Sequence, residues 1–169
     1  MRKQLFALLI LSILICSFTI VTIVAADSTI PLPDNIQIVP PADHVPTNVR
    51  EFFGATGKWS GECLLTSSGR PEDRPEVRIY FEEISMNEAN VIFATEGSTI
   101  HGMPRGYFRE KAKISLKGKR TLLSIPMPSS SDRLAVGKFW IDKGILKGER
   151  YISAPWGAFT SYFTLKPIN

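Results

Sequence analysis

The chain has 169 residues, of which 44% are hydrophobic and 21% charged, and its 20 lysines and arginines exceed its 16 aspartates and glutamates. This composition excludes a multi-pass membrane protein, a disordered chain and a disulfide-dense mini-protein. The length is that of one domain with a substantial hydrophobic core.

Residues 1–26 differ sharply from the rest of the chain. They begin with Arg2 and Lys3, continue as an almost unbroken apolar run and end in the small residues Ala25 and Ala26 before Asp27. This pattern predicts a signal peptide cleaved after Ala26. The run is also nearly long enough to span a bilayer, so an uncleaved membrane anchor is the alternative. Either way the body is exported, as a periplasmic or secreted protein, and contact with a membrane is expected only through this segment.

The chain has two cysteines, and Cys16 lies in the export segment. A lipoprotein signal would have a small residue before the cysteine, whereas Ile15 stands there. Cys63 is then left without an intramolecular partner. It is either a reactive thiol or a small buried hydrophobe in a strand, and we favour the second interpretation.

Residues 27–46 contain five prolines and read as an extended, Pro-rich tether. Thr47 follows as a plausible N-cap of a short helix that Gly54 ends. Phe52 and Phe53 at the end of this helix are expected to plug one end of the core. The remaining chain, 47–169, forms the predicted domain.

From Gly57 onward apolar and polar residues alternate in short segments that are separated by glycine- and proline-containing turns. In the first segment Trp59, Cys63 and Leu65 share one face, opposite Lys58. Each strand therefore has one buried and one wet face. Consecutive strands without intervening helices predict an all-β fold, an eight-stranded antiparallel up-and-down β-barrel, because closure removes the sheet edges. The predicted strands are residues 57–65, 76–84, 89–97, 105–116, 119–126, 132–142, 144–152 and 158–167.

The sequence Thr56-Gly57-Lys58-Trp59, just after a helical turn, resembles the Gly-x-Trp start of lipocalins and the first strand of avidins. The resemblance is to the calycin type of secreted eight-stranded barrel. It implies a small ligand bound in the barrel mouth, with Trp59 closing the floor. Fold-level likeness alone does not settle function.

Catalytic and cofactor motifs are absent from the sequence. It has no Gly-x-Ser-x-Gly, no Gly-x-x-x-x-Gly-Lys, no Gly-x-Gly-x-x-Gly and no His-Glu-x-x-His. Two isolated histidines and one remaining cysteine do not make a structural zinc site. We therefore predict no catalytic residue, metal or cofactor, and favour a non-enzymatic protein while an enzyme stays open as the last alternative.

Two charged residues fall on inward-facing positions of the predicted strands. Glu110 is in phase with Phe108 and Ala112, and Arg150 is in phase with Leu146. Because a buried charge is costly unless it is paired, these residues are either anchors for a polar ligand head group or a structural ion pair. Lys138, in phase with Val136 and Trp140, is a further candidate for the interior.

Two loops carry candidate ligand contacts at the rim of the barrel. The loop 98–107 contains His101, Met103 and Tyr107, and the loop 153–158 contains Trp156. Each is either a ligand- or partner-binding loop or an ordinary connection. The candidate ligand-binding residues are Trp59, Glu110, Arg150, His101, Tyr107 and Trp156.

A basic run from Lys111 to Arg120 is best explained as a solvated strand face. It lacks the interleaved aromatic residues that stack on bases, and we expect no nucleic-acid partner.

Three functions remain open at this point. The first is an exported, non-enzymatic barrel that binds a small, partly apolar molecule. The second is an exported protein-binding module, an inhibitor or envelope accessory factor, that uses the two loops against an envelope or extracellular protein. The third is a small isomerase or hydrolase with Glu110 as the general base.

Overall fold

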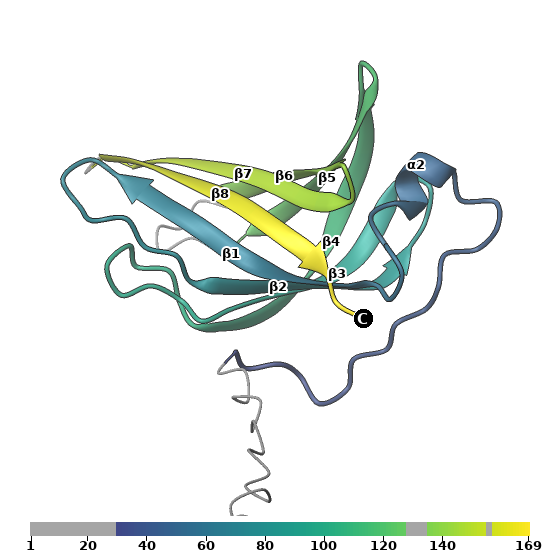
Figure 1. Cartoon of the computed structure of the whole chain (residues 1–169), viewed down its shortest axis with the longest axis horizontal. Coiled ribbons are helices and arrows are strands. Elements are labelled where there is room, and N and C mark those ends of the chain that lie inside the picture. The colour runs from purple at the N-terminus through teal and green to yellow at the C-terminus, as the bar shows by residue number, and fades with distance from the viewer. Residues whose placement is uncertain (1–29, 128–134, 155–156) are drawn as a thin grey trace, which may run out of the picture.

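The computed structural model describes residues 30–127, 135–154 and 157–169 (Figure 1). The predicted signal peptide and Trp156 lie outside these residues. The described chain forms a short helix and eight strands that close into one antiparallel barrel, so the predicted fold class is confirmed. The elements are α2 (Thr47–Arg50), β1 (Lys58–Ser67), β2 (Glu76–Ile84), β3 (Glu88–Thr95), β4 (Gly106–Lys117), β5 (Arg120–Met127), β6 (Ala135–Asp142), β7 (Ile145–Ala154) and β8 (Gly157–Pro167).

Each strand pairs with its neighbours in sequence, and the last strand returns to the first. β1 pairs with β8 from Trp59↔Pro167 to Ser67↔Phe159, which closes the barrel. Turn glycines at positive φ join the strands where the sequence placed hairpins, as at Gly118 and Gly144. Closure satisfies the backbone groups that an open sheet would expose at its two edges.

Side chains fill most of the barrel interior. The inward faces of the strands supply a continuous apolar cluster in which Trp59, Phe81, Phe93, Phe139 and Phe163 are the largest members. Aromatic rings meet directly within it, as in the T-shaped Phe93–Phe163 pair with ring centroids 5.9 Å apart. An eight-stranded barrel is just wide enough for such packing, so little space remains for a ligand along most of its length.

The inward phase of β6 differs from the one that the sequence suggested for Lys138. Phe139 is fully buried, whereas Lys138 and Val136 are exposed. Phe139 lies against Gly137 and Gly148, where a Cβ atom would come within 2.8 Å and 2.4 Å of its ring. The large Phe139 ring fits against the two glycines only from inside the barrel, so Phe139 faces inward. Lys138, the preceding residue, therefore faces solvent.

The floor of the barrel lies at the end that carries α2 (Figure 1). Phe52 and Phe53 are buried here, and the Trp59 indole N–H donates a 2.7 Å hydrogen bond to the Phe52 carbonyl. The helix is shorter than predicted, because the backbone turns after Arg50 and reaches Gly54 at a φ of 60°. Pro46, rather than Thr47, occupies the N-cap position and provides no side-chain cap.

Residues 30–46 run along the outside of the barrel. The Val39 N–H donates a hydrogen bond to the Glu82 carbonyl, and Arg109 on β4 donates to both oxygens of Asn35. Ile92 and Tyr80, which lie on the outer faces of β3 and β2, are buried. This proline-rich stretch therefore contacts the outer wall of the barrel. In the part of the chain that the structure describes, no helix has the length and apolar character needed to cross a membrane.

Candidate ligand-binding site

Among the residues that the structure describes, strand β4 has no paired neighbour along part of one side. It pairs with β3 over Gly106–Lys113 but with β5 only over Lys113–Lys117. Beyond Ser124, the described residues of β5 pair only with β6. Pro126 lies in this stretch and has no N–H to donate, which suits a strand edge. In the described part of the chain, backbone hydrogen bonds therefore do not seal the wall beside the first half of β4, and we call this stretch the seam.

A pocket of about 130 Å³ lies where this seam meets the mouth of the barrel. One wall is the stacked pair of Phe93 and Phe108, with ring centroids 5.0 Å apart. Its lining is otherwise a mixture of apolar side chains, backbone of the β3–β4 connection and one inward arginine. The lining residues are Phe93, Thr95, Met103, Pro104, Arg105, Gly106, Tyr107, Phe108 and Arg150.

Arg150 is the buried charge of this pocket, and only 8% of its surface is exposed. Strand β7 points it inward in phase with Leu146 and Gly148, as the alternation predicts. Its guanidinium donates a single long hydrogen bond, 3.4 Å from Nη2 to the Ser161 Oγ, and its Nε has no partner. No carboxylate among the described residues forms an ion pair with it.

The described surroundings of Arg150 do not compensate its charge. Burial removes water from the guanidinium and lowers the pKa of Arg150 from its ordinary value, yet an arginine stays protonated at neutral pH. The interacting titratable neighbour is Cys63, whose thiol is fully buried. Burial raises the pKa of Cys63 to about 12, despite the opposing effects of Arg150 and Ser161. The thiol is therefore neutral at physiological pH and does not balance the arginine.

Thr95 provides a second polar group in the pocket. Its side chain is buried, and its Oγ1 accepts a 3.0 Å hydrogen bond from the Gly97 N–H. The hydroxyl proton points to the Met103 Sδ, 3.9 Å away, and a thioether is a weak acceptor. This hydroxyl can therefore donate to a better acceptor placed in the pocket.

The structure brings Tyr107 and Arg150 together at the pocket but separates them from Trp59. Tyr107 is half exposed at the rim. Trp59 lies at the floor, six positions along β1 from Leu65, which pairs with Ser161 next to Arg150. At about 3.3 Å per residue this places Trp59 roughly 20 Å from the arginine level. The tryptophan closes one end and cannot contact a ligand at the other.

His101 connects two loops. Its Nε2 donates to the Pro71 carbonyl at 3.0 Å, its Nδ1 lies 3.3 Å from the Ser67 Oγ, and its backbone N–H donates to the Ser98 Oγ. The imidazole thus joins the β3–β4 loop to the β1–β2 loop. Met103 in the same loop is buried rather than exposed, so it does not provide the protruding contact that a partner-binding loop would need.

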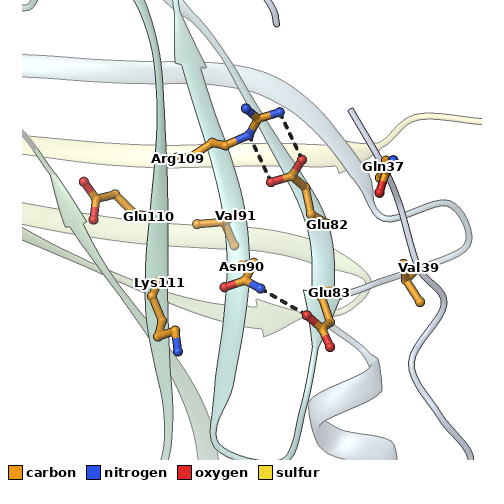
Figure 2. Close-up of a pocket in the computed structure, with 9 residues that line it drawn as sticks. All are labelled: Gln37, Val39, Glu82, Glu83, Asn90, Val91, Arg109, Glu110 and Lys111. Carbon is orange, nitrogen blue, oxygen red and sulfur yellow. Dashed lines mark hydrogen bonds and ion pairs between the residues drawn. The ribbon is translucent and has the colours of Figure 1, made fainter. Parts of the chain in front are cut away.

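Glu110 lies on the inward-facing phase of β4, next to Ala112, but it does not meet Arg150. It is partly exposed at the open seam and lines a different, shallower groove of about 420 Å³. Figure 2 shows its carboxylate turned away from Arg109 and Lys111. The expected structural ion pair between Glu110 and Arg150 is not formed among the described residues.

The groove at Glu110 is held together by its own charges. The Arg109 guanidinium donates to both oxygens of Glu82, at 3.2 and 3.3 Å, and the Asn90 amide donates to Glu83 (Figure 2). These contacts join strands β3 and β4 to strand β2. The groove is larger than the barrel-mouth pocket, but its paired groups have no need of a ligand. We therefore identify the Arg150 pocket as the candidate site.

Reasoning from the sequence did not identify Phe93, Thr95 and Phe108 as pocket residues. The alternating pattern marked Phe108 as inward, among aromatic residues that could line a cavity, but it did not single out Phe108 as a ligand contact. Thr95 gave no signal, because a threonine near a strand end is common. The length of the 98–107 loop was the available hint, since this loop forms one side of the pocket.

Groups of His, Cys, Asp and Glu that could hold a metal ion are not found among the described residues. Comparison of the chain with protein-family models, with curated proteins and with solved structures gives no match.

Proposed function

We propose that the protein is an exported, non-enzymatic binding protein that holds a small, partly apolar ligand in the mouth of its lipocalin-like barrel. One observation carries the proposal: an arginine that has no counter-charge among the described residues is buried against a hollow with aromatic walls. A buried polar group without partners costs free energy, and sites where a protein accepts such a cost are usually functional.

The shape of the interior supports binding of a small molecule rather than a large one. Side chains fill the barrel from the Trp59 floor to the level of Phe163, and the hollow occupies only the opposite end. Ligand pockets combine apolar walls with a few convergent polar groups. Phe93 and Phe108 supply the walls here, and Arg150 and Thr95 supply the polar groups.

NMR titration tests this function. The isotope-labelled mature chain, residues 27–169, would be titrated with a panel of neutral and anionic compounds of up to about ten non-hydrogen atoms. We expect amide shifts to cluster at residues 93–95, 103–108 and 150. Mass spectrometry of the native protein should also detect a co-purified small molecule. A panel without any binder, or shifts confined to other surfaces, would contradict ligand binding in the mouth.

Export is a separate part of the proposal and rests on residues 1–26. Sequencing of the N-terminus of the protein recovered from its own host tests it. A mature chain that begins at Asp27 is expected, whereas an intact Met1 in a soluble cell fraction would contradict export.

A further inference from the structure

The charge of the pocket indicates which chemical class of ligand it accepts. Resting on the function just proposed, we propose that the ligand is a small monocarboxylate, whose carboxylate is bound by the Arg150 guanidinium and the Thr95 hydroxyl and whose apolar part lies between Phe93 and Phe108.

The first argument is the unused hydrogen-bonding capacity of Arg150. A guanidinium has five N–H donors in a planar fork, and here one donor makes a 3.4 Å contact while Nε has no partner. A carboxylate accepts two parallel hydrogen bonds from such a fork. The ligand would thus satisfy donors that the protein itself leaves unsatisfied.

The second argument is charge balance. Two arginines line the pocket, and among its described lining residues Arg150 is the buried positive charge, whereas Arg105 is exposed and already makes an interaction of its own. The Cys63 thiol beside Arg150 is neutral. A monoanion neutralises this charge, whereas a phosphate dianion would leave an excess negative charge in a largely apolar site. A neutral ligand would leave the arginine uncompensated.

The third argument is size. The hollow measures about 130 Å³, and an apolar protein cavity of roughly 150 Å³ accepts a benzene molecule. A ligand of about six non-hydrogen atoms therefore fits. A carboxylate uses three of these atoms, and the rest form a short apolar tail against Phe93 and Phe108. A longer tail would leave through the seam beside β4.

The Thr95 hydroxyl supplies the second donor. The Thr95 Oγ1 already accepts a hydrogen bond from the Gly97 N–H, so the hydroxyl proton remains for donation. Its acceptor in the structure is the Met103 thioether, 3.9 Å away. Both donors line the same pocket. A carboxylate placed there can accept charge-assisted hydrogen bonds from both groups, and the Thr95 hydroxyl gives up only its weak contact with the Met103 thioether.

The decisive test compares butyrate with butyramide, which have the same size and differ in charge. Dissociation constants would be measured by NMR titration of the mature chain, residues 27–169, at neutral pH, with the Arg150 Nε–H signal as the direct readout. We expect butyrate to bind at least about tenfold more tightly than butyramide, because hydrogen bonds to charged groups are the stronger ones. The Nε–H signal should shift with butyrate only.

Variants separate a specific contact from general charge attraction. Arg150→Met should bring butyrate down to the affinity of butyramide. Lys138→Met is the matched control, since it removes the same charge from an exposed site on the neighbouring strand β6 and should leave the tenfold preference intact. If Arg150→Met does not fold, Arg150→Lys replaces it and should reduce the preference without abolishing it. The comparison of probes on the unaltered protein needs no variant.

The outcomes distinguish this inference from the function on which it rests. Equal binding of butyramide and butyrate would overturn the carboxylate assignment and leave ligand binding in place. Tighter binding of inorganic phosphate than of butyrate would also overturn it. Failure of both probes, and of every compound in the neutral panel, would overturn the binding function itself.

Discussion

Replacement of Arg150 by methionine should stabilise the protein when no ligand is present. Methionine has a similar length, lacks charge and adapts its shape to irregular apolar space. The change removes an unpartnered Nε donor, whose burial costs about 1–3 kcal/mol, and a desolvated charge. It forfeits one hydrogen bond of 3.4 Å, whose length makes it weak. Substitutions of buried ionic groups by apolar residues often stabilise proteins by about 1–4 kcal/mol.

We therefore expect the free energy of unfolding of Arg150→Met to rise by about 1–3 kcal/mol. Urea denaturation followed by tryptophan fluorescence measures this as a higher midpoint at an unchanged m-value. Thermal unfolding should show a Tm increase of roughly 3–10 °C for a domain of this size. Lys138→Met, at an exposed position, should stay within about 0.5 kcal/mol of the unaltered protein.

A loss of about 1 kcal/mol or more in Arg150→Met, at an unchanged m-value, would refute the reasoning. It would mean that the guanidinium contributes contacts that hold the barrel together. The stability gain and the loss of butyrate affinity together form the expected signature, because a residue retained for binding lowers stability in the absence of its ligand.

Two further predictions concern the packed part of the barrel. The folded pKa of Cys63 is raised from 9.0 to about 12, so its stabilising effect is present below pH 9 and is lost as the pH rises toward 12. Between pH 8 and pH 10 the unaltered protein should lose about 1.4 kcal/mol more than Cys63→Ser in urea denaturation, and equal losses would contradict the shift. Gly148→Ala places a Cβ 2.4 Å from the buried Phe139 ring and should cost about 1–3 kcal/mol. Phe139→Leu should rescue part of this cost in a double-mutant cycle, whereas strict additivity would contradict the clash.

The barrel itself could be predicted because the signals for it lie within each strand and each turn. The alternation of apolar and polar residues along β1 and β2 indicates which side chains face inward, and the turn glycines indicate where each strand ends. Those two signals gave eight strands in the right order. Which side chains of β6 face inward could not be predicted from that strand alone. It depends on the Phe139 ring, which fills the space that Gly137 and Gly148 leave open on two strands. The sequence around Lys138 does not indicate that this space exists.

The site was predictable only in part. The inward orientation of Arg150 followed from its phase with Leu146. The absence of a counter-charge did not, because Glu110 shares the same kind of inward phase and was a reasonable partner. What separates them is the end of the β4–β5 ladder at Lys113↔Ser124, which leaves Glu110 at an open seam. Strand alternation shows where a side chain points, but a ladder that stops early is a property of two strands together.

The seam also explains why the pocket and the core can coexist in one small barrel. A fully sealed eight-stranded barrel packs its interior with side chains, as this one does around Trp59 and Phe163. Among the described residues, Gly106–Ala112 pairs with a strand on one side only. Phe108 in this stretch is partly exposed, and its ring lines a hollow instead of filling it. The packed core around Trp59 can thus provide the free energy of folding that offsets the cost of burying Arg150 at the other end of the barrel. On this reasoning, a change that extends the β4–β5 ladder would stabilise the barrel and close the route into the pocket.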